Sequence, residues 1–370
     1  MKMVDEYRNP EQIRALSAGI RAAVGDRRYR FMEICGGHTH SIYRFGLNEL
    51  LPENIELIHG PGCPVCVLPI GKVDEALTLT NDPQVVLCAF GDVMRVPGSK
   101  ASPLEAKARG KDVRMVYSPL DALKLAIENP DKQVVFFAIG FETTAPSTAL
   151  TILRAAQLKV TNFSVFCNHV TVGPPIRSIL ESADLELDGF IGPGHVSAVI
   201  GTRPYDFVAE EFGRPLVVSG FEPVDILESI LLLVKMVNRG EASIYNQYVR
   251  AVKRDGNPAA IAAIEEVFEE RPRFEWRGLG FIDQSAYRIQ KAYREFDAEA
   301  RFAMEEIRSP EPENAICGDV LIGAKRPENC PLLGVVCTPE QPVGALMVSS
   351  EGACSAYYTY VHRTLAAAKG

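Results

Sequence analysis

Residues 56–66 read ELIHGPGCPVC, and this segment shows how the chain is built. The aliphatic run Glu56–His59 predicts a buried strand, and Gly60-Pro61-Gly62 predicts a tight turn at its end, directly before Cys63. The same order, a short strand followed by a loop with chemically reactive side chains, recurs further along the sequence. The later loops are Gly140-Phe141-Glu142-Thr143-Thr144, Cys167-Asn168-His169, Gly192-Pro193-Gly194-His195 and Ser219-Gly220-Phe221-Glu222.

Strands alternate with helical segments through the first two thirds of the chain, which predicts parallel sheets with crossover helices. The expected strands are Glu56–His59, Val85–Phe90, Val113–Tyr117, Val134–Ile139, Phe163–Phe166, Gly189–Ile191 and Leu216–Val218. The expected helices are Pro10–Val24, Val73–Leu79, Leu120–Glu128 and Ser147–Gln157. Loops at the carboxyl ends of such strands form the ligand crevice of open α/β sheets. We therefore expect two α/β lobes whose loops face a central cleft.

The 370 residues agree with roughly two to three domains. We expect α/β lobe I at residues 1–130, with Cys35 and the Cys63/Cys66 loop, and α/β lobe II at residues 131–222. The turn Asn129-Pro130-Asp131 is the expected seam between them. Residues 223–370 predict a mostly helical third domain, with helices at Val224–Arg239, Ile244–Val252, Ala259–Glu269 and Ser285–Phe296.

Net charge and hydropathy exclude some classes of binding partner. The net charge of -8 and the pI near 5.5 argue against nucleic acid and against an anionic membrane surface. The longest apolar run, Ile230–Val234, is far shorter than the ~20 residues that span a bilayer. Residues 1–14 are polar and lack the apolar core of a signal peptide, so we expect a cytoplasmic protein.

The sequence has nine cysteines, and in a reducing compartment they indicate metal binding or redox chemistry rather than a disulfide framework. Cys63 and Cys66 have the spacing of a redox dithiol, in which the second thiol resolves a mixed disulfide formed by the first. The same spacing also suits half of a zinc site, or two inert thiols. We favour the redox or exchangeable-ligand role.

Cys35 opens the motif Cys35-Gly36-Gly37-His38-Thr39-His40. A thiolate beside an imidazole suits an activated nucleophile or a soft ligand for a transition metal. The alternative is that His38 or His40 is a structural histidine that caps a turn. Because the glycines and the nearby Cys63/Cys66 loop indicate a reactive site, we favour the functional role for Cys35 and His38.

Four late cysteines are separated by 12, 6 and 16 residues, among many prolines: Cys317, Cys330, Cys337 and Cys354. Four thiolates suffice for a 4Fe-4S cluster or for tetrahedral zinc, and the irregular spacing favours the cluster. We therefore expect this segment to be ordered by a metal centre. Cys88 and Cys167 fall in expected strands and are interpreted as buried apolar residues.

Glu142 and Glu222 each follow a Gly-Phe pair in a strand-end loop. Either carboxylate is suited to orient a histidine or relay a proton, and either is equally suited to cap the helix that follows. His195 lies in another of these loops. The candidate catalytic residues are Cys35, His38, Cys63, Cys66, Glu142 and His195.

With these motifs assembled, the chain closely resembles the hydrogenase maturation factor HypD family. The likeness covers nearly the whole chain, and its first two motifs are the most specific. It rests on Cys35-Gly36-Gly37-His38-Thr39-His40, Gly60-Pro61-Gly62-Cys63-Pro64-Val65-Cys66, Gly140-Phe141-Glu142-Thr143-Thr144, Pro193-Gly194-His195-Val196-Ser197, Ser219-Gly220-Phe221-Glu222-Pro223 and the four late cysteines.

The resemblance implies two α/β lobes and a third domain with a 4Fe-4S cluster held by Cys317, Cys330, Cys337 and Cys354. It also implies work with the small chaperone HypC and the cyanide donor HypE, which together build an Fe(CN)2CO unit for a NiFe hydrogenase. In this picture Cys35 binds the transient iron with a cysteine of the small partner, and Cys63 and Cys66 form a reversible dithiol. We hypothesise an electron relay from cluster to dithiol to iron. The protein is then an assembly scaffold with redox chemistry rather than a conventional turnover enzyme.

Two other functions remain open. The first is an iron-sulfur thiol-disulfide oxidoreductase that acts on protein disulfides, although such an enzyme has no need of Cys35 in its Gly-Gly-His loop. The second is a structural zinc protein, which metal analysis distinguishes. No Walker-type glycine loop is present, so any ATP dependence is expected in a partner.

Overall fold

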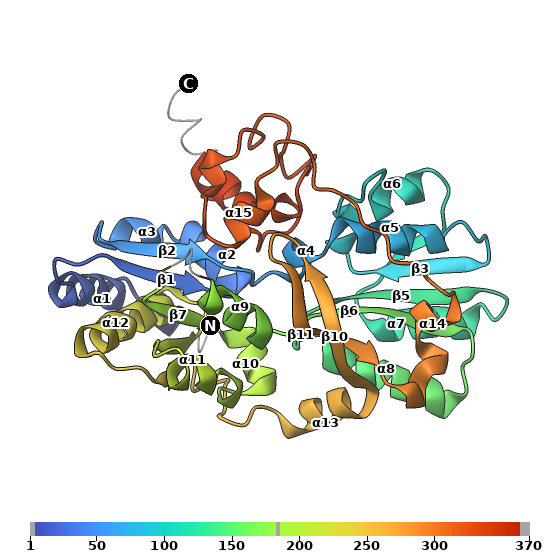
Figure 1. Cartoon of the computed structure of the whole chain (residues 1–370), viewed down its shortest axis with the longest axis horizontal. Helices are drawn as coiled ribbons and strands as arrows, with labels where there is room; N and C mark the ends of the chain where they lie inside the picture. The colour runs from blue at the N-terminus through green and yellow to red at the C-terminus, as the bar shows by residue number, and fades with distance from the viewer. Residues whose placement is uncertain (1–3, 183–185, 363–370) are drawn as a thin grey trace.

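The computed structural model describes residues 4–182 and 186–362 (Figure 1). Two parallel sheets lie side by side along the long axis, and an antiparallel hairpin crosses between them. The cysteine-rich segment near the C-terminus sits over the first sheet. This is the expected α/β fold with two lobes. The expected domain ranges also include residues 1–3, 183–185 and 363–370, which lie outside the described residues.

The first sheet, here sheet A, has the strand order β2-β1-β7-β8-β9 with parallel pairing throughout. Its central strands are buried on both faces, as expected for a parallel sheet covered by helices. The strands are β1 (Tyr29–Glu33), β2 (Ile55–His59), β7 (Gly189–Pro193), β8 (Leu216–Ser219) and β9 (Ile244–Asn246).

The second sheet, sheet B, has the order β4-β3-β5-β6 and is also parallel. Its strands are β3 (Val85–Ala89), β4 (Val113–Met115), β5 (Gln133–Gly140) and β6 (Phe163–His169). The predicted seam at residues 129–131 is wrong, because β3 and β5 lie on either side of it and pair directly, Val86 with Val134. Sheet B is instead a continuous stretch of chain inserted between the strands of sheet A.

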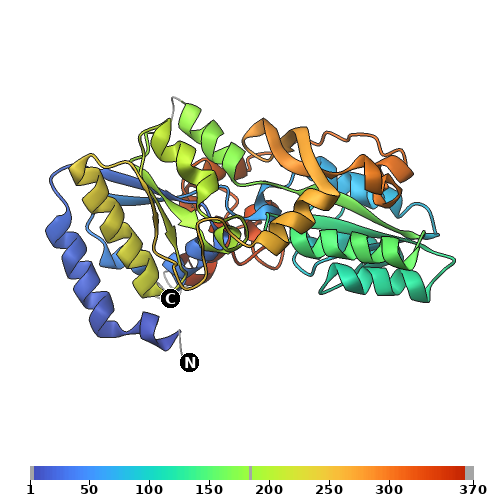
Figure 2. The same cartoon turned by 90° about the horizontal axis from the view of Figure 1, so that it is seen from below.

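Helices cover both sheets. Figure 2 shows α1 and α12 side by side at the outer end of sheet A. Asn9 begins α1 by accepting the Glu11 N–H at 2.8 Å, and Gly240, with φ +64°, ends α12. The helices of eight or more residues are α1 (Pro10–Ala23), α2 (Gly36–Arg44), α5 (Ile70–Leu79), α7 (Pro119–Glu128), α8 (Ala145–Leu158), α9 (Gly173–Glu181), α12 (Pro223–Arg239) and α13 (Pro258–Val267).

Shorter helical segments connect these elements. They are η1 (Asp5–Arg8), α3 (Leu47–Leu50), α4 (Pro64–Val67), η2 (Val93–Arg95), α6 (Pro103–Ala108), α10 (Gly194–Ile200), η3 (Arg203–Tyr205), α11 (Asp206–Glu210), η4 (Lys291–Phe296) and α14 (Ala298–Arg301). The cysteine-rich segment contains α15 (Cys317–Leu321), η5 (Pro327–Asn329), η6 (Ala345–Met347), α16 (Ala353–Tyr357) and η7 (Tyr358–His362). No helix among the described residues is long and apolar enough to cross a bilayer.

A mostly helical third domain from residue 223 is wrong. The helix α12 packs on sheet A, and β9 extends that sheet where a helix over residues 244–252 was expected. The expected helix at residues 285–296 is largely the second strand of a hairpin, β10 (Phe268–Trp276) with β11 (Gly280–Ile289). In both places the apolar residues at helical spacing predicted a helix, but pairing with a neighbouring strand determines the backbone conformation instead.

Candidate functional site

Cys35 lies at the carboxyl end of β1, as the N-cap residue of α2. Its carbonyl accepts the His38 N–H at 2.8 Å, so the motif forms the first turn of the helix. The side chain is only 6% exposed. Burial, with the charges of Glu351 and Glu33 nearby, raises the pKa of the thiol. Cys35 is therefore a protonated thiol until a cation or a partner stabilises the thiolate.

The Cys63/Cys66 loop joins the Cys35 loop directly, because β1 and β2 are neighbours in register with Glu33 opposite His59. Gly36 N–H donates to the Gly62 carbonyl at 3.1 Å, and Gly60 N–H donates to the Glu33 carbonyl at 2.9 Å. A Cβ atom on Gly62 would overlap the backbone of Cys35. The glycine is required here for the close approach of two backbones.

A disulfide joins Cys63 and Cys66, whose Cα atoms are 5.2 Å apart. Cys63 is the N-cap of α4, and its sulfur accepts the Cys66 N–H at 3.3 Å. The two residues are 4% and 0% exposed. The pair is therefore almost closed to solvent.

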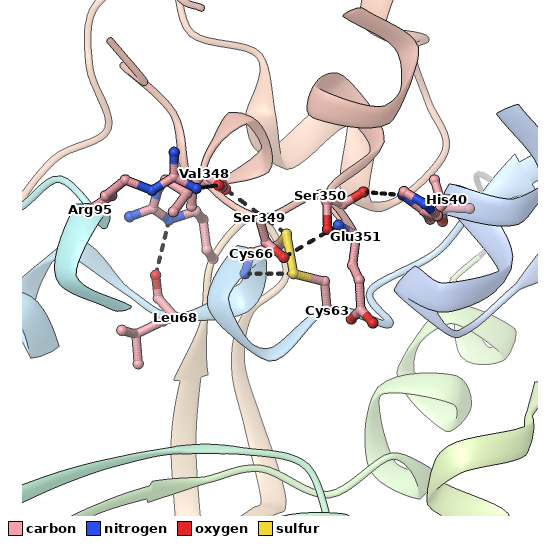
Figure 3. The surroundings of a disulfide bond; sticks show 12 residues. His40, Cys63, Cys66, Leu68, Arg95, Val348, Ser349, Ser350 and Glu351 are labelled. Atoms are coloured by element: carbon pink, nitrogen blue, oxygen red, sulfur yellow. Dashed lines mark hydrogen bonds between the residues drawn. A yellow bond between two sulfur atoms is a disulfide. The ribbon is translucent and has the colours of Figure 1, made fainter. Parts of the chain in front are cut away.

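A short segment, residues 348–351, covers the disulfide (Figure 3). Arg95 Nη2 donates to the Val348 carbonyl at 2.6 Å on one side, and His40 Nδ1 bonds the Ser350 carbonyl at 3.1 Å on the other. Glu351 lies on this segment, and burial raises the pKa of its carboxyl. In the sequence analysis, the alternative for His40 was a structural histidine that caps a turn. In the structure, His40 instead holds the covering segment, residues 348–351, in place.

The disulfide, the Cys35 loop and the cover enclose a narrow cavity, and the Glu351 carboxylate belongs to its wall. Its lining comes from three distant parts of the chain: Gly36, Thr39, His59, Gly60, Cys63, Cys66, Val320, Leu321, Leu346, Glu351, Gly352 and Ala353. The early thiols and the cysteine-rich segment therefore meet at a single place.

Glu33, which the sequence analysis did not single out, lies completely buried under Cys35. Its carboxylate accepts the Cys35 N–H at 3.1 Å, the Thr39 hydroxyl and His59 Nδ1 at 2.7 Å. Since Nδ1 of His59 donates, its Nε2 accepts the Tyr43 hydroxyl at 2.9 Å. Burial outweighs these hydrogen bonds and raises the pKa of Glu33. The network fixes the turn that presents Cys35.

His38 is held in one tautomer. Its Nε2 lies 3.2 and 3.0 Å from the carbonyls of Ser219 and Gly220, so Nε2 must carry the hydrogen. Nδ1 is buried and has no hydrogen-bond partner among the described residues. Burial lowers the pKa of His38 to about 4. A neutral imidazole with a free Nδ1 lone pair is suited to bind a metal, whereas burial makes it a weak proton acceptor.

His195 lies near His38, and an aromatic ring stacks against both histidines. The Phe221 ring lies between the two histidines, with centroids 3.9 Å from His195 and 4.7 Å from His38. The structure therefore brings Cys35, His38 and His195 together at the carboxyl edge of sheet A.

Glu142 lies at the carboxyl edge of sheet B instead. Its Oε1 accepts the Val172 N–H at 2.9 Å, while Oε2 is buried without a hydrogen-bond partner in the described part of the chain. Burial raises the pKa of Glu142 to about 7. The capping alternative fails here, since Thr144 is the N-cap of α8. It holds for Glu222, which is the N-cap of α12 and pairs with Arg8.

Tyr205 is a further buried residue that was missed by the sequence analysis. Its hydroxyl accepts the Ser197 hydroxyl at 3.1 Å, and Ser197 lies in the Pro193-Gly194-His195-Val196-Ser197 motif. Burial raises the pKa of Tyr205. The tyrosine therefore supports the loop that carries His195.

The four late cysteines line a second cavity with almost entirely apolar walls. The lining is Ala315, Cys317, Cys330, Leu332, Leu333, Cys337, Gly344, Leu346, Met347 and Cys354. Burial, aided by Glu311, Cys337 and Cys330 and opposed by Arg277, raises the pKa of Cys317 to about 12. Four thiolates in such a pocket need a cation to balance them, so the donor set fits a 4Fe-4S cluster and equally fits zinc.

The two cavities share a wall. Leu346 lines both of them, and the sulfur of Cys66 lies 4.0 Å from the Ala345 carbonyl. The other two cysteines are apart from this site: Cys88 and Cys167 are buried in β3 and β6, as expected.

The fold and these two cavities define the class: a two-lobed α/β protein with a buried dithiol, an adjacent third thiol and a pocket of four cysteines. Comparison with known proteins gives the family. The family described as "HypD: Hydrogenase formation hypA family" matches residues 11–361, and the chain belongs to it.

The chain is similar to several curated hydrogenase maturation factors. Hydrogenase maturation factor HypD of Rhodobacter capsulatus is 55% identical over 370 residues, covering 97% of this chain and 98% of the relative. HypD2 of Bradyrhizobium diazoefficiens is 54% identical, covering 97% of each chain. HypD of Escherichia coli is 51% identical, covering 97% of this chain and 98% of the relative. The expected family is confirmed, and with it a role in hydrogenase maturation.

Proposed function

We propose that this protein is the scaffold on which the Fe(CN)2CO unit of NiFe hydrogenase is assembled. It works with a HypC-type small chaperone and a HypE-type cyanide donor, and its redox chemistry serves assembly rather than conventional turnover. The observation that carries the proposal is the convergence of seven thiols: Cys35 adjoins the Cys63/Cys66 loop, and the four-cysteine pocket shares a wall with the dithiol cavity.

Cys35 holds the iron in this proposal, together with a cysteine of the small chaperone. Iron with strong-field diatomic ligands suits soft thiolates. The positive end of α2 and the Cys35 position at its N-cap favour the thiolate once the cation is present. His38 offers Nδ1 on the first turn of the same helix as a further ligand.

The Cys63/Cys66 pair supplies electrons to the assembly. Reduction of the disulfide takes up two electrons and two protons and gives two thiols, and reoxidation returns them. Cys317, Cys330, Cys337 and Cys354 would hold a 4Fe-4S cluster, which supplies single electrons when bound. The protein chain brings the four-cysteine pocket and the dithiol cavity close together, since Leu346 lines both cavities. The relay from cluster to dithiol to iron is part of this proposal.

The geometry disfavours the alternative of an oxidoreductase for protein disulfides. A protein substrate must bring a sulfur atom in line with one of the two thiols. Cys63 and Cys66 are 4% and 0% exposed and covered by residues 348–351. The dithiol is placed to exchange electrons inside the protein rather than with a second chain.

Infrared spectroscopy tests the proposal. The protein is purified without oxygen from cells that supply the chaperone and the cyanide donor, and the complex is examined for cyanide and carbonyl stretching bands. We expect the bands in the wild-type protein and in Cys88→Ala, whose thiol lies in sheet B, and their loss in Cys35→Ala. Bands that persist in Cys35→Ala contradict the proposal.

Metal analysis of the same material tests the four-cysteine pocket. Four acid-labile sulfides per chain, with four irons in addition to the iron at Cys35, are the expected result for a 4Fe-4S cluster. Zinc without labile sulfide would instead make the pocket a structural site.

A further inference from the structure

Arg277 occupies the tip of the β10–β11 hairpin and is almost completely buried, with 3% of its surface exposed. It is tied to the segment that follows the dithiol. Its backbone N–H donates to the Val67 carbonyl at 2.9 Å, and its Nε donates to the Leu68 carbonyl at 3.0 Å. The hairpin tip is thereby fixed against the loop that carries Cys66.

The guanidinium is only partly neutralised. Glu311 lies 3.2 Å from Nε and is 38% exposed, while Nη1 and Nη2 are both buried and have no hydrogen-bond partner in the described part of the chain. Burying a cation with unpaired N–H groups is costly unless a negative group lies nearby. The two Nη groups of Arg277 are therefore suited to an anionic partner in addition to Glu311.

The four-cysteine pocket lies on the other side of the hairpin tip. Gly278 contacts Gly318, the residue after Cys317, so closely that a Cβ atom on Gly318 would lie 2.8 Å from the Gly278 Cα. The hairpin tip thus stands between the dithiol loop and the backbone next to the first cysteine of the pocket.

We propose that Arg277 is the counter-cation of the four-cysteine metal centre and sets its reduction potential. This inference rests on the proposed function. A 4Fe-4S centre held by four thiolates is anionic, and one-electron reduction makes its net charge more negative by one. A fixed positive charge in a water-poor region stabilises the reduced state more than the oxidised state, so it raises the potential.

The position of Arg277 has a second consequence, which concerns the dithiol loop. Because Arg277 holds the Leu68 carbonyl and the next residue, Gly278, contacts Gly318, the potential of the metal centre and the position of the dithiol loop are linked through the hairpin tip. Arg277 is a positioning residue for electron supply, and it touches neither the iron at Cys35 nor a substrate.

Redox titration of the full chain, reconstituted with iron and sulfide and followed by electron paramagnetic resonance, tests the proposal. Arg277→Gln removes the positive charge. We expect the ratio of reduced to oxidised centre at a fixed potential to fall roughly tenfold, a shift of about 59 mV to more negative potential. Arg277→Lys keeps the positive charge and should shift the reduction potential less than Arg277→Gln does.

Glu311→Gln gives the opposite sign. It removes the negative charge beside Arg277 and should move the midpoint potential to more positive values. Arg273→Gln is the matched control, since Arg273 lies on the same hairpin but is exposed over the Phe281 ring. Its potential should equal that of the wild-type protein.

An unchanged potential in Arg277→Gln at full iron content overturns the inference, as do shifts of the same sign in Arg277→Gln and Glu311→Gln. If Arg277→Gln fails to fold, Arg277→Lys and Glu311→Gln still decide the matter. A wild-type protein that takes up zinc and no iron-sulfur centre overturns the inference together with the cluster assignment, and metal analysis separates that result from an unchanged potential.

Discussion

Gly36 and Gly62 are joined by one backbone hydrogen bond of 3.1 Å, and through it the loop of Cys35 and the loop of the dithiol behave as one unit. The contact exists because their strands, β1 and β2, are neighbours in sheet A. Both loops are short, so neither can move independently of the other without breaking this hydrogen bond.

The first prediction concerns Gly62→Ala. The added methyl group would overlap the Cys35 backbone, so we expect a loss of about 1–3 kcal/mol in the free energy of unfolding, together with loss of the infrared bands. Urea denaturation measures the first effect. Gly173→Ala is the control, since nothing lies within 4 Å of its Cβ position, and its stability should stay within about 1 kcal/mol of wild type. A Gly62→Ala protein as stable as Gly173→Ala would show that the loops separate freely.

The second prediction concerns pH and Glu142, whose pKa burial raises from 4.5 to about 7. The folded state holds this proton more tightly than the unfolded state. The stabilisation is therefore complete below pH 4.5 and is lost as the pH rises through about 7. Between these limits we expect the wild-type protein to lose about 3 kcal/mol relative to Glu142→Gln.

Urea denaturation at acidic and at mildly alkaline pH measures this difference. Glu105→Gln is the control with the opposite sign, because hydrogen bonds from Ser102 lower the pKa of Glu105. Its stabilisation is present at neutral pH and is lost as the pH falls. A Glu142→Gln protein whose stability parallels wild type at every pH would mean that the carboxyl is not buried.

The third prediction concerns access to the dithiol. Because Cys63 and Cys66 are 4% and 0% exposed, a small thiol should reduce the disulfide at least about tenfold more slowly in the folded protein than in urea. Thiol counting after quenched reaction gives both rates. Thioredoxin, which is far larger, should not reduce the folded protein at a measurable rate. Equal rates for the small thiol and thioredoxin would restore the oxidoreductase alternative.

The fourth prediction concerns the metal pocket. Cys354 lies on α16, which packs against α2, the helix that Cys35 begins. We expect Cys354→Ser to lower metal affinity by at least about tenfold, to expose residues 309–344 to proteolysis, and to loosen the Cys35 loop.

Metal content and limited proteolysis measure these effects. Cys167→Ser is the control, since Cys167 lies on β6 in sheet B and its side chain can keep the 3.5 Å contact with the Tyr287 carbonyl of β11. Intact metal binding in Cys354→Ser would remove this cysteine from the ligand set.

The sequence predicted most strands of both sheets, because buried parallel strands are continuous aliphatic runs. It missed β1, where Arg30 and Glu33 interrupt the run. Each residue is paired with a charged or basic side chain from the neighbouring strand β2, Arg30 with Glu56 and Glu33 with His59. The division between the lobes failed for a similar reason: the pairing of β1 with β7 depends on chain segments about 160 residues apart.

The motif residues of the candidate site were recognisable because cysteine, histidine and glycine cluster there. The residues around them were not. Glu33, Glu351 and Arg277 look like ordinary surface charges in the sequence, and only burial reveals what they contact. Glu33 ends β1, a strand that the sequence did not predict, so no sequence signal pointed to this carboxylate.

The insertion of sheet B between the strands of sheet A also dictates when the site can exist during translation. The strand that carries Cys35 leaves the ribosome early but cannot pair with β7 until about 160 further residues have been made. The segment that closes over the dithiol follows more than a hundred residues later still. A nascent chain therefore cannot form the cavity until Ala353, the last residue of its lining, has been made.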